Sequence, residues 1–481
     1  MPDVRYVCLS DLHFGAENSI LTDVVPDKVI ADPSRPSRAM TALVACLDEI
    51  VSHNQGGTKP TLILCGDILE LALTTDNIAA MVFDRFVELA FPPSGSVFDS
   101  TVWYLPGNHD HHIWETARER QYAQYLRRRP LAEPLENPWH TTRMFTEHDP
   151  DWVDAELLTT LMRRHPHLQD VTVRAVYPNL GISSPDGRKC VVFHHGHFLE
   201  SIYRLMSVVK DYMFPNRDRP QSVWEIEAEN FAWIDFFWST LGRSGEVGSD
   251  VGFVYASFQS DEAMDRLAHN LARGIKEHMH GHPIRATIES WALEPVIRHF
   301  ARRIGEAERA QPTPALTPGA QEELKRYIDG PLYHQLRAED RSPESLTFVF
   351  GHTHKPFQQP CPTERFPRGV HTYNTGGWVV DTLDPVPLQG GAAVLVDENL
   401  DAASLHLYQQ RPEDSDYRVT VEQAEGQDGG EFLRRLRSIV EPGGQPWAEF
   451  SAAAAQLVRQ RHADLRNILD RGGVTGAPRD R

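Results

Sequence analysis

The sequence has few cysteines, and they are not arranged to build a structural site. The five cysteines among 481 residues are widely scattered and include no C-x-x-C pair. They are Cys8, Cys46, Cys65, Cys190 and Cys361. An odd number at wide spacing argues against a disulfide framework and against a zinc ribbon. This cysteine usage predicts a reducing, cytoplasmic location.

Long apolar runs and an excess of basic residues are also missing. There is no uninterrupted run of about 18 apolar residues, and the N-terminal segment has no basic region followed by a long apolar one. We therefore expect no transmembrane segment, while a peripheral membrane contact stays open. The 48 Lys and Arg against 67 Asp and Glu give a net charge of -19. Because this charge repels a phosphate backbone, it argues against a nucleic-acid partner.

The main recurring feature of the sequence is a set of short apolar segments, each of which ends in a polar or glycine-containing cluster. They are VRYVCLSDLH (4–13), TLILCGD (61–67), TVWYLPGNHD (101–110), CVVFHHGH (190–197) and LTFVFGHTH (346–354). Such segments are typical of strands buried on both faces. Apolar residues recur at helical spacing over 40–51 and 78–89, between the strands. This alternation predicts an α/β fold, and later segments at 369–380, 391–400 and 404–411 add strands, so we expect a central β-sandwich flanked by helices.

The same patterns predict the organisation of the chain. We expect a catalytic domain over 1–410, with its core at 1–110, 171–200 and 345–410. Residues 111–170 and 198–345 interrupt the alternation of strands and helices and are predicted to be insertions. The second of these is predicted to form a large helical cap. Residues 411–481 read as a C-terminal helical extension, with a frayed tail at 472–481.

Each of the five segments ends in side chains that can bind a metal ion. They are Asp11 and His13, Asp67, Asn108 and His109, the histidines of 194–197, and His352 with His354. Taken singly, each motif has an ordinary explanation as a turn or polar loop. Because ligands bind at the carboxyl ends of strands in α/β sheets, the five ends are expected to converge. Carboxylate, amide and imidazole ligands without thiolate suit Mn, Fe or Zn, and Asp67 is the natural bridge between two such ions.

The motifs D-x-H, G-D, G-N-H-D, H-G-H and G-H-x-H, in this order, resemble the signature of the calcineurin-like metallophosphoesterase superfamily. The resemblance covers about residues 4–15, 61–70, 102–110, 190–198 and 346–380. It implies two divalent metal ions that share Asp67. One would be held by Asp11, His13, Asp67 and His354, and the other by Asp67, Asn108, His195 and His352. His195 is chosen over His194 because it immediately precedes the glycine, and the register of this motif stays open.

The resemblance also implies catalytic and substrate-binding roles. His109 would face the scissile phosphate and assist the leaving group, and Asn108 and His109 would both contact substrate. The acid that orients His109 is either Asp110 or Glu70, with equal weight. His197 would be a substrate contact or a neighbour of the ligands, and the N-x-G turn at 374–376 would lie beneath the site.

The function implied is hydrolysis of a phosphate ester or anhydride by a metal-bridging hydroxide, on a small or lipid-linked substrate. Alternatives are a UDP-diacylglucosamine-type pyrophosphate hydrolase, a nuclease of the same superfamily, or a catalytically silent binding module. Residues 201–241 are rich in aromatic side chains. They predict either a helical subdomain that packs these side chains inside or an apolar lid for an acyl chain or a membrane surface.

Overall fold

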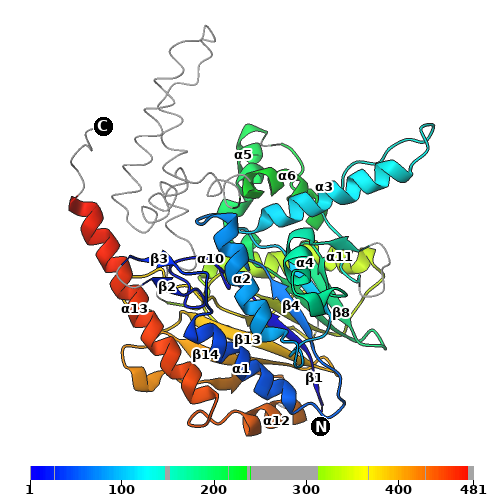
Figure 1. Cartoon of the computed structure of the whole chain (residues 1–481). Coiled ribbons are helices and arrows are strands. Elements are labelled where there is room, and N and C mark those ends of the chain that lie inside the picture. The colour runs from blue at the N-terminus through cyan, green and yellow to red at the C-terminus, as the bar shows by residue number, and fades with distance from the viewer. Residues whose placement is uncertain are drawn as a thin grey trace.

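The computed structural model describes residues 2–25, 28–146, 152–214, 216–235, 239, 313–366, 368–427 and 430–474. Its mixed α/β class is the one predicted (Figure 1). Much of the predicted cap (240–312) and the end of the predicted tail (475–481) lie outside the described residues.

Within the described residues, the larger sheet has eight strands. Their order is β15 (Thr420–Glu422), β14 (Ala402–Gln409), β13 (Gly390–Asp397), β1 (Val4–Leu9), β4 (Thr61–Cys65), β5 (Thr101–Leu105), β7 (Thr172–Ala175) and β6 (Val153–Asp154). Strands β1, β4, β5 and β7 are parallel, whereas β13 to β15 are antiparallel to their neighbours. The carboxyl ends of the parallel strands therefore lie along one edge of the sheet.

The smaller sheet has five strands among the residues described. Their order is β11 (Phe357–Cys361), β12 (Val370–Asn374), β10 (Ser345–Phe350), β9 (Lys189–His194) and β8 (Asn179–Ser183). Strands β9, β10 and β12 are parallel, and β8 and β11 are antiparallel edge strands. A short ribbon pairs β2 (Val24–Val25) with β3 (Ile30–Ala31).

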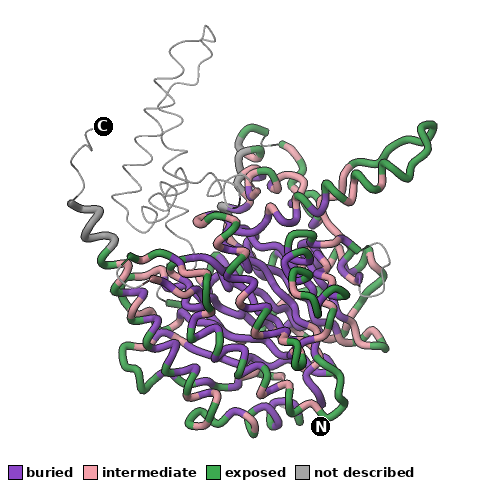
Figure 2. Tube along the Cα trace, in the orientation of Figure 1, coloured by how far each residue is buried: buried purple, intermediate pink, exposed green. Residues whose placement is uncertain are grey.

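One buried apolar cluster contains side chains of both sheets. From the larger sheet come Cys8, Ile63, Trp103 and Val394, and from the smaller sheet Val191, Val349 and Tyr373. The strands appear in Figure 2 as a buried interior. All five cysteines are free and buried. The shared core holds the two sheets in a defined relation, so that their strand ends can build a common site.

Helices cover the larger sheet on its outer side. They are α1 (Arg38–Ser52), α2 (Asp76–Ala90), α4 (Glu156–Arg163), α12 (Glu431–Ile439) and α13 (Trp447–Val474). Helix α1 begins at Ser37, whose hydroxyl accepts the amide of Met40 at 3.0 Å, and it buries the predicted apolar positions Leu43 and Leu47. Helix α13 runs beside α1 (Figure 1) and adds Trp447 and other side chains to the same apolar cluster.

Elements beyond residues 110 and 410 also pack on the larger sheet. Strand β15 and helix α13 belong to the larger sheet and its covering layer, although both lie beyond 410. Within 111–170, β6 pairs with β7 and α4 packs on α2, whereas α3 (His111–Arg128) projects outward with an exposed tip (Figure 2). Sequence analysis did not predict the short strands β6 to β8, because they lack a long apolar run.

The described parts of the predicted cap are helical. They comprise the 3-10 turns η2 (His197–Leu199) and η3 (Ser201–Arg204), helices α5 (Leu205–Met213), α6 (Val223–Ile234), α10 (Pro318–Tyr327) and α11 (Tyr333–Ala338), and the π-helical turn η7 (Ile328–Leu332). Two further 3-10 turns, η1 (Pro166–Leu168) and η8 (Asp414–Asp416), lie elsewhere. Helix α6 buries Ile226 and Ile234, while Trp224 is 47% exposed.

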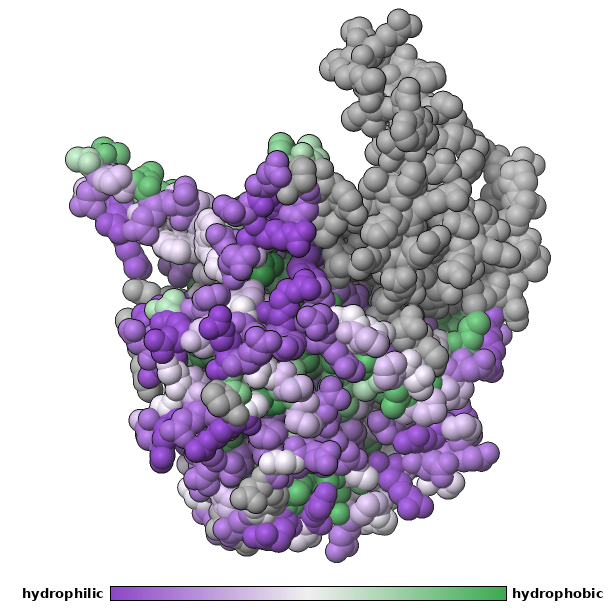
Figure 3. Space-filling view, turned by 180° about the vertical axis from the view of Figure 1, so that it is seen from behind, coloured by the Kyte–Doolittle hydropathy of each residue, from purple (hydrophilic) through white to green (hydrophobic). Residues whose placement is uncertain are grey.

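The face of the molecule seen in Figure 3 is mainly hydrophilic where the chain is described, with small separate apolar areas. No helix among the described residues combines the length and the apolar character needed to cross a membrane.

Candidate metal centre

The loops after β1 and β4 run side by side and place the first candidate ligands. The amide of Asp11 donates to the carbonyl of Gly66, and the amide of His13 to that of Asp67, each at 2.9 Å. These bonds continue the parallel pairing of β1 with β4 beyond the strands. Asp11, His13 and Asp67 therefore face a common space at the carboxyl edge of the larger sheet.

The loop after β5 is tied to Asp67 directly. The Asp67 Oδ1 atom accepts the backbone amide of His109 at 2.7 Å. This bond fixes the G-N-H-D loop against the D-x-H and G-D loops. Asn108 is buried there, and its Oδ1 lies 3.0 Å from Nε2 of His195.

The smaller sheet joins the site through Asp11. The backbone amide of His352, which follows β10, lies 3.0 Å from both carboxylate oxygens of Asp11. The neighbouring loop after β9 is held because the Gly351 amide donates to the carbonyl of His195 at 2.9 Å. Strand ends separated by more than 300 residues in the chain thus meet at one place.

Among the described residues, buried histidines and aspartates of these loops form three overlapping groups, and the donor atoms within each group lie within 4.8 Å of one another. The groups are Asp11, His13 and His354; His13, Asp67 and His109; and Asp67, His195 and His352. All of these residues are buried. Asp67 and His13 each belong to two groups, so the groups form one continuous centre, and Asn108 adjoins it through His195.

The backbone of this centre is strained where the ligands leave their strands. Asp11, His13, Asp67, His352 and His354 all have φ between +46° and +71°. Residues that carry a side chain avoid this left-handed region, because adopting it costs about 1–3 kcal/mol for each residue. Five such residues at one place indicate that the fold holds side chains in directions that local preference would not choose.

The donor atoms fit metal ions. Nδ1 of His13 is 2.8 Å from Glu70, and Nδ1 of His195 is 3.2 Å from the carbonyl of Cys65. A partner on Nδ1 leaves Nε2 as the coordinating nitrogen. The buried Nε2 atoms of His13 and His352 have no hydrogen-bond partner. Buried nitrogens without partners are costly, and a cation between them and Asp67 would remove the cost.

The charges of the centre are strongly coupled. Burial opposes ionisation of Asp67, but the surrounding His195 and His109 hold the pKa of its carboxyl well below the usual value. Burial likewise disfavours charged His354 and His195, yet neighbouring carboxylates raise the pKa of each ring to about 9. Metal binding to these rings should therefore release protons.

His109 is oriented by Glu70. Its Nδ1 lies 2.8 Å from Oε1 of Glu70, which also accepts the amides of Ala72 and Leu73, each at 3.0 Å. Although burial raises it, the pKa of Glu70 is held below the usual value by His109 and His13. Glu70 is therefore negatively charged, and it holds the Nδ1 atoms of His109 and His13 in place.

Asp110, the alternative acid for His109, has a different role. Its carboxylate accepts the backbone amides of Gly107 at 2.7 Å and Ile68 at 2.8 Å, and contacts those of Asp67 and Leu69. It therefore stabilises the two loops that carry Asp67 and Asn108. Of the two acids that the sequence left open, Glu70 is the one whose carboxylate contacts the His109 ring, whereas the Asp110 carboxylate points toward backbone amides.

The three histidines of the H-H-G-H motif lie in different surroundings. His195 faces Asp67, with 3.3 Å between Nε2 and Oδ2. His194 belongs to β9, and its ring packs on Tyr327 and Phe348. His197 is fully buried 3.4 Å from the hydroxyl of Tyr177, and its Nδ1 has no hydrogen-bond partner. Only His195 of the three is in a candidate metal group, and a substrate contact by His197 stays a prediction.

Glycines let the loops approach the ligands closely. A Cβ atom on Gly107 would lie 2.1 Å from Oδ1 of Asp67, and one on Gly351 would lie 2.2 Å from Oδ2 of Asp11. Asn374 belongs to the N-x-G turn that was predicted beneath the site, and it stabilises the same region. Its side chain donates to the carbonyl of Gly351 at 2.9 Å and accepts the amide of Gly376 at 2.8 Å.

Replacing Gly107 by alanine is expected to destabilise the metal centre. The new methyl group would overlap the Asp67 carboxylate and backbone, which costs about 1–3 kcal/mol where neighbours cannot move. Thermal unfolding and bound-metal analysis would measure the effect. Gly443→Ala is the matched control, since no atom lies within 4 Å of the added Cβ. Equal melting temperatures and metal contents for the two variants would contradict the role given to Gly107.

Sequence analysis missed three acidic contacts. Glu70 lies 2.8 Å from Nδ1 of His13 as well as contacting His109. Asp381 lies 3.4 Å from Nδ1 of His354, and Glu200 lies 3.6 Å from Nε2 of His352. No short motif carries these contacts, because each joins residues from separate loops.

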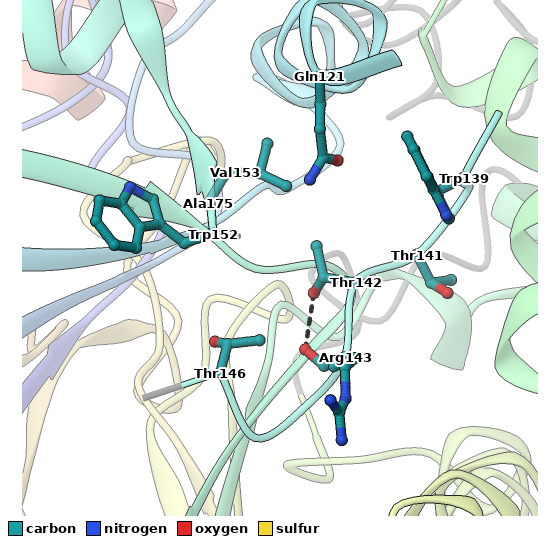
Figure 4. A pocket seen from close by; sticks show the side chains of 9 residues that line it. All are labelled: Gln121, Trp139, Thr141, Thr142, Arg143, Thr146, Trp152, Val153 and Ala175. Carbon is teal, nitrogen blue, oxygen red and sulfur yellow. Dashed lines mark hydrogen bonds between the residues drawn. The ribbon is translucent and has the colours of Figure 1, made fainter. Parts of the chain in front are cut away.

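A pocket of about 240 Å³ lies elsewhere, between α3, β6 and β7 (Figure 4). Gln121, Trp139 and Trp152 contribute to its lining, and the hydroxyl of Thr142 donates to the carbonyl of Arg143 at 2.9 Å. None of its lining residues belongs to the candidate metal groups.

No family model matches the chain, and no curated protein matches it. A solved structure of a dimetal phosphatase from Danio rerio is similar over 88% of this chain and 99% of that one, with 12% sequence identity and a TM-score of 0.31. The chemistry of the centre is therefore inferred from its own residues.

Proposed function

We propose that this protein is a dinuclear-metal-dependent phosphoesterase that hydrolyses a phosphate ester or anhydride. The observation that carries the proposal is the buried centre in which Asp67 belongs to one group with His13 and to another with His195 and His352. The ordered motifs that resemble the calcineurin-like metallophosphoesterases support the same assignment.

The residues fit two ion positions. Asp11, His13, Asp67 and His354 would hold one ion, and Asp67, Asn108, His195 and His352 the other. Their oxygen and nitrogen donors suit Mn, Fe or Zn. When bound, a pair of such ions would act as a Lewis acid toward phosphate oxygens and lower the pKa of water.

The remaining chemistry belongs to His109 and the residues that hold it. Glu70 accepts the Nδ1 proton of His109, so Nε2 is the nitrogen left for proton transfer. A positively charged His109 ring would be stabilised by the Glu70 anion and could protonate the leaving oxygen of a substrate. Asn108, adjacent in the loop, would help to orient the phosphate. General acid catalysis of this kind contributes about 10²- to 10⁴-fold.

The partner we propose is a small or lipid-linked phosphate compound. The net charge of -19 opposes long nucleic acids, so a nuclease is the less favoured activity. A catalytically silent module is also less favoured, because the chain retains His109 together with its orienting Glu70.

A substrate panel assayed with metal-reconstituted protein tests the proposal. Protein stripped by a chelator and reloaded with Mn²⁺, Fe²⁺ or Zn²⁺ would be given aryl phosphate mono- and diesters, nucleotides, cyclic nucleotides, UDP-sugars and single-stranded DNA. We expect hydrolysis that vanishes with the chelator and returns with metal. Binding of two ions without turnover of any substrate would favour a binding module, and failure to bind any divalent cation would reject the proposal.

A further inference from the structure

An acidic side chain lies beside His354, one of the candidate ligands. Oδ2 of Asp381 is 3.4 Å from Nδ1 of His354, which is an ion-pair distance. The side chain of His354 is 3% exposed and that of Asp381 is 14% exposed, so the contact is shielded from most of the solvent. Asp381 follows the segment that carries the last sequence motif, and the proposed function gives it no role.

The two nitrogens of the His354 ring face different groups. Nε2 lies 3.6 Å from Oδ1 of Asp11. Asp11, His13 and His354 form one candidate metal group, in which the donor atoms lie within 4.8 Å of one another. Nδ1 faces Asp381, which belongs to none of the groups found among the described residues. Nε2 is therefore the nitrogen on the side of the other ligands, and Asp381 lies on the opposite side of the ring.

His13 shows the same arrangement within the same group. Its Nε2 is 3.9 Å from Oδ2 of Asp67, and its Nδ1 is 2.8 Å from Oε2 of Glu70. Histidines that bind a metal commonly donate the proton of the other ring nitrogen to a carboxylate, which fixes the tautomer and the direction of the ring. Asp381 therefore stands in the same relation to its imidazole as Glu70 does.

The His354 ring is enclosed on other sides as well. A Cβ atom on Gly377 would lie 2.5 Å from Cδ2 of His354, so the ring lies directly against that glycine. The ring of His13 meets it edge to face, with centroids 5.4 Å apart. The carbonyl of His354 accepts the amide of Gly390 at 3.1 Å. Because these contacts leave the ring little room to move, a carboxylate fixed at Nδ1 would set which nitrogen is free for an ion.

The segment that carries Asp381 is fixed on both sides of this residue. On one side, the amide of Val380 donates to the carbonyl of Asn18 at 3.0 Å. On the other side, Nδ1 of His462 in helix α13 donates to the carbonyl of Thr382 at 2.8 Å. His462 is 3% exposed, so this bond is buried. A carboxylate on a backbone held in this way can keep a neighbouring ring in one orientation.

Helix α13 also reaches the loop that follows the D-x-H motif. Arg461, which is 1% exposed, donates from Nη2 to the carbonyl of Ser19 at 3.2 Å and to that of Thr22 at 2.7 Å. Ser19 pairs in turn with Val379 through an isolated antiparallel bridge. The C-terminal helix thus holds the loop after β1 and the segment of Asp381 against each other.

We propose that Asp381 is the positioning residue of His354, because it holds the proton on Nδ1 and so directs Nε2 toward the ion. The inference rests on the proposed two-metal function and concerns the ion assigned to Asp11, His13, Asp67 and His354. Through helix α13, it also makes the region beyond residue 410 a support of metal binding.

Calorimetric titration of the metal-free protein with Mn²⁺ tests this role. The wild type should bind two ions. Asp381→Ala should bind one of them about 10- to 100-fold more weakly, since removal of such a partner usually costs that much affinity. Asp381→Asn should lie between the two, because its amide oxygen still accepts a hydrogen bond from Nδ1 but carries no charge. Wild-type affinity for both ions in Asp381→Ala would overturn the proposal.

Asp384→Asn is the matched control for removing a carboxylate from the same segment. The side chain of Asp384 is 85% exposed, and its Oδ1 lies 2.7 Å from Arg466. This variant removes the same charge three residues away and should bind both ions as the wild type does. Equal weakening in Asp384→Asn and Asp381→Asn would attribute the effect to the charge of the segment and refute a positioning role.

Two further measurements separate positioning from other roles. The absorption of bound Co²⁺ reports the ligands of the ion, so at saturating Co²⁺ the Asp381→Asn variant should keep the wild-type band. A changed band would identify Asp381 as a ligand and overturn the proposal. All titrations are run below the melting transition of every variant, and a lower melting temperature with unchanged affinity would show a purely structural role. If the wild type binds no divalent cation at all, the proposed function itself fails.

Discussion

Substitution of Asp67 by asparagine is expected to remove hydrolytic activity and the bound metal together. Asp67 is the carboxylate that belongs to both sides of the centre, through His13 on one side and His195 on the other. Asparagine keeps the shape of the side chain but removes the negative charge that two cations would share. If the transition state loses several kcal/mol of stabilisation by the metal ions, kcat/KM falls by at least about 10³-fold.

The same carboxylate also positions the loop that carries His109. Its Oδ1 accepts the backbone amide of His109 at 2.7 Å, a bond that the asparagine oxygen can retain. The isosteric variant therefore isolates the effect of charge better than alanine would. Metal content of the purified protein, together with turnover on the best substrate of the panel, would measure the result.

Asp397→Asn is the matched control for a buried aspartate. Asp397 is fully buried at the end of β13 and accepts the amides of Asn399 and Asp401, each at 2.8 Å. Its replacement can lower the melting temperature but should leave two ions bound. Full metal content in Asp67→Asn would show that Asp67 is not the shared ligand.

Replacement of His109 by alanine should separate catalysis from metal binding. Because the ring is assigned to proton transfer, we expect turnover to fall about 10²- to 10⁴-fold while two ions remain bound. His53→Ala, which removes a half-exposed histidine at the end of α1, should change neither quantity. Metal loss in His109→Ala equal to that in Asp67→Asn would contradict the separate roles.

Glu70→Gln should give an intermediate result, because Glu70 contacts both His109 and His13. The two Nδ1 atoms contact different oxygens of Glu70, and glutamine replaces one of these oxygens by an NH2 group, which donates hydrogen bonds and cannot accept them. We expect turnover to fall and metal affinity to fall about 10- to 100-fold through the loosened His13. Unchanged metal affinity would show that the contact with His13 contributes nothing to binding.

Local pattern was enough to locate the strands and the candidate ligands. Apolar runs of buried parallel strands such as 61–65 and 346–350 end at the sheet edge, and polar residues follow at once. Since those ends must lie at the same edge of each sheet, Asp67 and His352 could be placed near one site from sequence. The choice of His195 over His194 stays a prediction; His195 lies beside Asp67, whereas His194 is the last residue of β9 and packs into the apolar layer.

Sequence was a poor guide to short elements and to packing partners that are distant in the chain. Strands β6 and β7 contain few residues and alternate apolar with polar side chains, so they lacked a signal of their own. Helix α13 has an amphipathic pattern that did not reveal its partner, α1, about 400 residues earlier. Packing partners at such separation depend on the whole fold.

The sequence by itself determined that buried strands would end in carboxylate and imidazole groups, since residue type and the apolar pattern are local properties. Only the tertiary structure decided which acid serves which ring. Glu70 lies between His109 and His13, Asp110 turns to backbone amides, and Glu200 reaches His352 from the helical insertion. These choices depend on distances of a few ångström between separate loops, and such distances are set when the two sheets pack around their shared core.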